Sequence, residues 1–99
     1  MAAKPRDGLL AIHEIERMCH ERGGSFGRAR YDGNAGGVVL AVAFWTAPAL
    51  ADFVRLLDDA LGRNRPGDLR VLGWTFRRHT QRGRGYVTGR IVVDPARLE

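Results

Sequence analysis

The chain repeats one pattern, which consists of a helix-like stretch, a glycine stop and two strand-like stretches. The first copy runs from Asp7 to Trp45 and the second from Thr46 to Asp94. A helix with one apolar side and a strand pair with an apolar face each need a surface to pack against, and two such units can supply it to each other. We therefore expect an α+β protein, an αββαββ two-layer sandwich with both helices on one face of a four-stranded sheet.

The first copy predicts a helix over about residues 7–22 and strands over about residues 25–31 and 38–45. Apolar residues recur at intervals of three and four, as on one side of a helix: Leu9, Ile12, Ile15 and Cys19. Asp7 is a suitable helix cap, and Gly23-Gly24 is a suitable stop because glycine takes the left-handed conformation that ends helices. The turn-forming residues 32–37 predict that the two strands form a hairpin.

The second copy predicts a helix over about residues 47–61 and strands over about residues 69–78 and 86–94. Its helix has the strongest periodicity in the chain, carried by Leu50, Phe53, Val54, Leu57 and Leu61. Thr46 can cap this helix through its hydroxyl, and Pro48 is tolerated in the first turn. A turn over residues 80–85 closes the second hairpin, so residues 1–99 are expected to form one domain.

This element order corresponds to a circularly permuted ferredoxin-like fold, in which the second and fourth strands are central. Residues 38–45 are apolar on both faces, as a central strand should be, whereas the first strand carries Arg28 and Arg30. Only one face of the sheet can meet the helices, so apolar side chains remain for a partner. The candidate partner interface consists of Leu40, Val42, Leu72, Trp74 and Phe76.

The sequence contains no pattern that indicates catalysis, a metal or a cofactor. His13 and His20 are two helical turns apart, about 10 Å, which is too far for one ion without further ligands. Ser25, His79 and Asp32 have no nucleophile motif around them, and Asp58-Asp59 point about 100° apart on a helix. We expect no enzymatic activity, no small-molecule substrate and no cofactor.

A net charge of +5 raises the question of a polyanionic partner. Four of the sixteen basic residues lie close together at the expected tip of the second hairpin, where they would form a basic finger: Arg77, Arg78, Arg82 and Arg84. Tyr86 beside them could stack on a base. The sequence therefore keeps open an alternative function, a small basic module that binds nucleic acid.

Several segments together resemble one family. These are Leu9 to Gly24, the block Val38 to Leu57 with its APALADFVRLLDDAL run, and the stretches LRVLGWTFRR and GYVTGRIVVD. They are similar, in apolar pattern and element order, to the C-terminal periplasmic domain shared by type II secretion protein M and the pilus-assembly protein PilO. The resemblance covers nearly the whole chain and contains no ligand-binding motif.

The resemblance implies a scaffold in the inner-membrane assembly platform of a bacterial secretion or pilus machine. The chain would be its periplasmic domain, with the membrane anchor outside the sequence given. The resemblance also implies a homodimer that pairs with a related subunit, of the L type in secretion systems or the PilN type in pili. The basic second hairpin departs from the family pattern, so the family's interface cannot simply be transferred.

Overall fold

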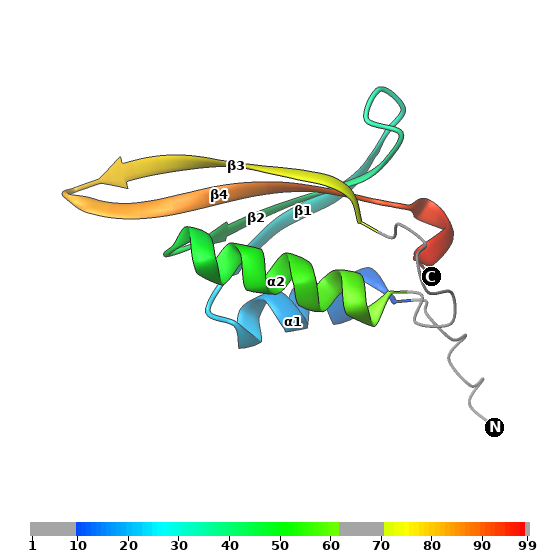
Figure 1. Ribbon diagram of the computed structural model, residues 1–99, viewed down its shortest axis with the longest axis horizontal. Helices are drawn as coiled ribbons and strands as arrows, with labels where there is room; N and C mark the ends of the chain where they lie inside the picture. The colour runs from blue at the N-terminus through cyan, green and yellow to red at the C-terminus, as the bar shows by residue number, and fades with distance from the viewer. Residues whose placement is uncertain (1–9, 62–70, 99) are drawn as a thin grey trace.

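The computed structural model describes residues 10–61 and 71–98, and its elements follow the predicted order. They are α1 (Ile12–Glu21), β1 (Ser25–Asp32), β2 (Gly37–Phe44), α2 (Ala47–Ala60), β3 (Val71–Gln81), β4 (Arg84–Val93) and the short 3-10 helix η1 (Pro95–Arg97). The four strands form one antiparallel sheet in the order β1-β2-β4-β3, and both helices lie on the same side of it (Figure 1). The expected α+β two-layer sandwich is confirmed and is consistent with a ferredoxin-like fold. The circular permutation stays a prediction.

The two helices begin differently. In α2 the Thr46 hydroxyl accepts a hydrogen bond from the Ala49 amide at 3.2 Å, as the sequence indicated. The expected start of the first helix near residue 7 is wrong, because the cap residue of α1 is Ala11. Leu10 forms a parallel bridge with Leu98 and donates its amide to the Arg97 carbonyl at 3.1 Å, which keeps the backbone there extended. Asp7 itself lies outside the described residues.

The first helix ends where the glycine pair predicts. Gly23 has a φ of 79°, in the left-handed region, and the amides of Gly23 and Gly24 donate to the carbonyls of His20 and Cys19. This is the Schellman arrangement, which satisfies the carbonyl groups that a helix end leaves free. The chain is thereby turned directly into β1.

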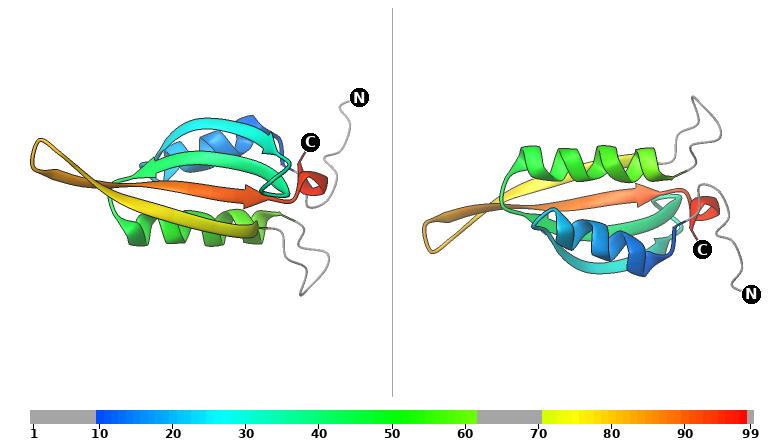
Figure 2. Two further views of the ribbon diagram at one scale, coloured as in Figure 1. Left: turned by 90° about the horizontal axis from the view of Figure 1, so that it is seen from above. Right: turned by 90° about the horizontal axis from the view of Figure 1, so that it is seen from below.

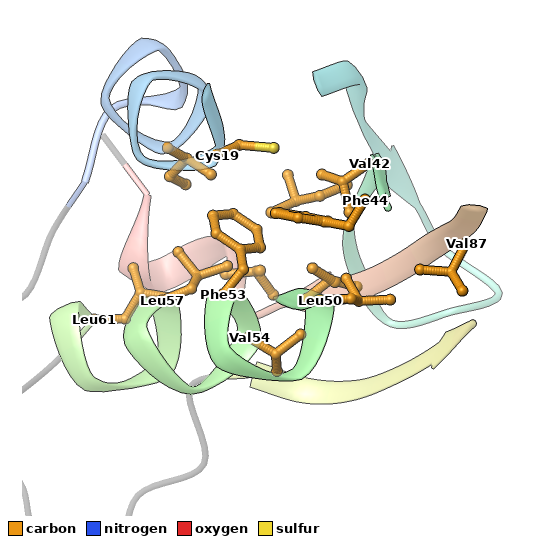
Figure 3. Close-up of a cluster of buried hydrophobic side chains, with 13 residues drawn as sticks. Cys19, Val42, Phe44, Leu50, Phe53, Val54, Leu57, Leu61 and Val87 are labelled. Carbon is orange, nitrogen blue, oxygen red and sulfur yellow. The ribbon is translucent and has the colours of Figure 1, made fainter. Parts of the chain in front are cut away.

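The register of the sheet decides which side chains face the helices. Antiparallel partners project to the same face, and Leu40 lies opposite Ile91 while Val42 lies opposite Gly89. The sheet residues that face the helices are buried and pack against apolar residues of α1 and α2. Together these residues form the core: Ile15, Cys19, Leu40, Val42, Phe44, Leu50, Phe53, Val54, Leu57, Leu61, Val87, Ile91 and Val93 (Figure 3). The alternate residues of β2, which include Val39, Ala41 and Ala43, therefore lie on the opposite face, which we call the open face.

The second hairpin is longer than predicted. β3 continues to Gln81 and β4 begins at Arg84, whereas the sequence predicted that the third strand ends near residue 78 and the fourth begins near residue 86. Residues 69 and 70 of the predicted third strand lie outside the described part. Arg82 and Gly83 form the whole turn, with φ angles of 53° and 77°. Two consecutive left-handed residues suit the twist of a hairpin, so pairing can extend almost to the tip. The hairpin projects past the helices along the 50 Å axis of the molecule (Figures 1 and 2).

Candidate functional site

The structure divides the predicted partner interface between core and surface. Leu40 is 0% exposed and Val42 is 4% exposed, so including them in the interface was wrong. Their side chains are the larger apolar set of β2, and burial against the helices removes more apolar area from water than burial of Ala41 and Ala43 would. The other three residues remain on the surface, with Leu72 44%, Trp74 38% and Phe76 42% exposed.

These three residues lie on β3, which has a strand neighbour on one side only. Trp74 pairs with Ile91 and Phe76 pairs with Gly89, which places both aromatic side chains on the helix side of the sheet. Their rings stack with centroids 6.1 Å apart. The Arg78 guanidinium lies 5.5 Å from the centre of the Phe76 ring. An edge strand with exposed aromatic groups offers both unpaired backbone groups and apolar area to a partner.

The four arginines of the predicted basic finger do not form one cluster. Arg77 lies opposite Thr88 on the open face, whereas Arg78 lies opposite Val87 on the helix side. Arg82 occupies the turn. Arg84 stacks its guanidinium on Trp45, 4.1 Å from the ring centre. The hairpin therefore distributes its charge over two faces and its tip.

Next to the arginines, the hairpin contains a small aromatic platform. His79 and Tyr86 are cross-strand partners whose rings stack with centroids 4.9 Å apart. His79 Nε2 is also hydrogen-bonded to the Thr88 hydroxyl at 2.8 Å. Both interactions fix the rings on the open side of the sheet, beside Trp45 and Arg84.

The open face also collects arginines that the sequence did not single out as a site. Register sets Arg28, Ala41, Arg90 and Thr75 in one row across the sheet, and Arg30 lies two residues further along β1. The side chains of the row are small between the arginines, and the face is hollowed there, with a volume of about 760 Å³. Alternating arginines at 28 and 30 were a visible signal, but Arg90 joins them only through strand pairing.

One carboxylate lies among these arginines. Asp32 Oδ2 accepts a hydrogen bond from Arg90 at 3.0 Å, and its Oδ1 accepts the Asn34 amide at 2.9 Å in the first hairpin turn. Asp32 therefore has a structural role at the end of β1. Ser25, His79 and Asp32 do not form a catalytic triad, since Ser25 and Asp32 stand at opposite ends of the eight-residue strand β1.

The remaining polar candidates have structural roles or lie apart. Asp58 accepts the Val71 amide at 3.0 Å, which ties α2 to the start of β3. His13 and His20 are exposed on α1 while Cys19 is buried. Across residues 10–61 and 71–98, no three His, Cys, Asp or Glu side chains come together in a way that could hold a metal ion.

Comparison of the chain with protein-family models, with curated proteins and with solved structures finds no match. Within the described ranges, no helix has the length and apolar character that crossing a bilayer requires.

Proposed function

We propose that this domain is a non-enzymatic assembly module that associates through the exposed edge of β3. Three of the five large hydrophobic residues exposed in the described part of the chain lie on this one strand, and this observation carries the proposal. The other two, Tyr31 and Trp45, lie on β1 and just beyond β2. Apolar side chains on an unpaired strand edge favour association with another protein surface.

The partner we propose is first a second copy of this chain, with the two β3 strands antiparallel across a twofold axis. Antiparallel pairing over the apolar half of β3, Val71 to Phe76, would continue the sheet from one copy into the other. The basic half from Arg77 onward would then point away from the axis in both copies, which separates like charges. Trp74 and Phe76 of the two copies would come together on the helix side.

The resemblance to the periplasmic domain of secretion protein M and PilO supplies the biological setting of the proposal. In that setting the domain belongs to the inner-membrane platform of a type II secretion or type IV pilus machine, and its β3 edge also accepts a related platform subunit. The support is the pattern of apolar segments together with the exposed edge.

Sedimentation equilibrium of the 99-residue chain, with matched variants, tests the proposal. We expect a monomer–dimer equilibrium for the wild type, and a dissociation constant at least tenfold higher for Phe76→Arg, about 1.4 kcal/mol or more. Tyr31→Arg is the control, because Tyr31 is an aromatic residue at the other edge of the sheet and is 64% exposed. It should leave the equilibrium unchanged.

Circular dichroism establishes that both variants are folded before their association is compared. Because apolar burial and backbone hydrogen bonds are not screened by salt, the dimer should persist in about 1 M salt. A wild-type chain that stays monomeric at several hundred micromolar would refute the proposal, as would equal weakening by the two variants.

A further inference from the structure

Three shallow hollows adjoin one another along the open face of the sheet, and together we call them the groove. Its middle is the hollow of about 760 Å³ over Ala41, Ala43 and Thr88. A hollow of about 460 Å³ adjoins it at Ala41 and Arg90, and one of about 200 Å³ adjoins it at Ala43 and reaches Tyr86. From residue 39 to residue 45 the groove follows the chain for roughly 20 Å, a length that accommodates a few nucleotides.

The charge of the groove is strongly positive. Among the described residues of the four strands, five guanidinium groups and one carboxylate face the open side: Arg28, Arg30, Arg77, Arg84, Arg90 and Asp32. The helix layer has the opposite balance, with six carboxylates and three guanidinium groups in residues 12–22 and 47–61. A polyanion would therefore be attracted to one side of the molecule and repelled by the other.

The arrangement of the arginines suits a linear polyanion. They form a diagonal band that starts on β1 with Arg28 and Arg30, crosses Arg90 on β4, reaches Arg77 on β3 and ends at Arg84 beside Trp45. Arg28 and Arg30 are two strand residues apart, roughly 6.7 Å, so two neighbouring anionic groups of one chain can be bound at once. Each guanidinium can donate two parallel hydrogen bonds to a phosphate.

The residues at the bottom of the groove and at its hairpin end favour a nucleic acid over other polyanions. Small side chains at Ala41 and Ala43 let a bound chain approach the sheet closely. At the end of the groove the stacked pair of Tyr86 and His79 stands beside Trp45, which supplies flat aromatic surfaces of the kind on which unpaired bases stack.

We propose that this groove binds single-stranded nucleic acid, with phosphates on the arginine band and a base against the Tyr86–His79 platform. The site lies on the open face, whereas the side chains of Trp74 and Phe76 project to the helix side, although Phe76 also borders the hollow of about 760 Å³. The proposal does not depend on self-association.

Fluorescence anisotropy of labelled oligo(dT) and oligo(U) about twelve nucleotides long, titrated with the full chain at about 20–200 mM salt, tests the proposal. Each phosphate neutralised on a single strand contributes about −0.7 to the slope of log K against log salt. Arg90 is left out of the count because it pairs with Asp32. The four other arginines of the band, Arg28, Arg30, Arg77 and Arg84, predict a slope of about −2.8.

The double variant R28Q/R30Q should bring the slope to about −1.4 and weaken binding roughly fiftyfold at about 50 mM salt. R17Q/R55Q is the matched control, because it removes the same charge from exposed residues of α1 and α2. It should change affinity less than about threefold, since α1 and α2 lie on the other side of the sheet from the bound chain, where distance and salt weaken the attraction between charges. Tyr86→Leu should weaken binding about tenfold without changing the slope, because only stacking is lost.

Three results would overturn the proposal. The first is no binding by the wild type at about 20 mM salt. The second is equal weakening by the two double variants, which would mean attraction to net charge and no defined site. The third is competition by polyglutamate of equal charge as strong as by unlabelled oligonucleotide, which would assign the groove to an acidic protein. Tighter binding of oligo(U) than oligo(dT) would support an RNA ligand, and the reverse a DNA ligand.

Discussion

Cys19 shows how burial alone sets the chemistry of a residue. Its side chain is 0% exposed in the core, and burial, with a smaller contribution from the charge of Glu16, raises the pKa of its thiol from 9.0 to about 11. Thiolate is the reactive form of cysteine. Cys19 is therefore a small apolar core residue in the folded chain and an unreactive thiol at neutral pH.

The raised pKa predicts that stability depends on pH in the alkaline range. The unfolded chain loses the Cys19 proton near pH 9 and the folded chain only near pH 11. The contribution is therefore fully present below pH 9 and is lost as pH rises from about 9 to about 11, by at most about 2–3 kcal/mol. Urea unfolding across this range should show the fall in the wild type. Cys19→Ala, whatever its absolute stability, should show a smaller fall; equal falls would contradict the assignment.

Gly37 is required by space at the point where β2 meets β4. A Cβ atom at this position would lie 2.5 Å from the Val93 carbonyl oxygen, which is backbone and cannot rotate away. Gly37→Ala should lower the free energy of unfolding by about 1–3 kcal/mol.

Gly33→Ala in the same hairpin is the control for Gly37, since the nearest atom to its added Cβ would be 4.0 Å away. We expect a change within about 0.5 kcal/mol. Urea titration with a common slope measures both variants. Similar losses in the two proteins would show that turn flexibility, and not contact with β4, requires glycine at position 37.

At the scale of elements, the second hairpin is defined by its two-residue turn. The turn holds Arg82 at a φ of 53°, and this is the one described residue other than glycine with a positive φ. A left-handed conformation costs most side chains about 1–2 kcal/mol, and asparagine tolerates it better. The long hairpin, with its aromatic platform and Arg84, therefore forms despite an unfavourable residue in its turn.

Replacing that residue should stabilise the protein. Arg82→Asn gives the Asn-Gly pair that this turn type prefers, and should raise the free energy of unfolding by about 0.5–1 kcal/mol. Gly83→Ala, at a φ of 77°, should lower it by about 1 kcal/mol. Thermal unfolding of the two variants checks both signs. A gain from both substitutions would show that the turn adopts another conformation.

The sequence predicted the elements well where periodicity and caps are local. The Thr46 cap, the end of α1 at Gly23-Gly24 and the apolar side of α2 are all confirmed. It predicted the start of the first helix wrongly, because the parallel bridge from Leu10 to Leu98 joins residues at opposite ends of the chain. It also ended the second hairpin strands too early, because the polar residues near the tip do not show how far pairing continues.

At the scale of the whole molecule, two surfaces lie on different sides of one thin sandwich. The β3 edge presents Trp74 and Phe76 on the helix side, and the open face presents the arginine band. Figure 2 shows the ribbon from the open face on the left and from the helix side on the right. Their proposed ligands differ in physical character, because association at the edge depends on apolar burial while binding in the groove depends on salt. An edge variant such as Phe76→Arg and a groove variant such as R28Q/R30Q therefore separate the two proposals.

The sequence by itself determined the element order, the αββ repeat and the central position of β2 and β4, because each depends on local propensity and on how much apolar surface a strand carries. Only the tertiary structure decided which face of the sheet is covered. Alternation puts Leu40 and Ala41 on opposite faces, but both are apolar, so the choice rests on packing against α1 and α2. That choice places Arg28 and Arg90 on the open face, and strand register, set across sixty residues of chain, brings them into one row.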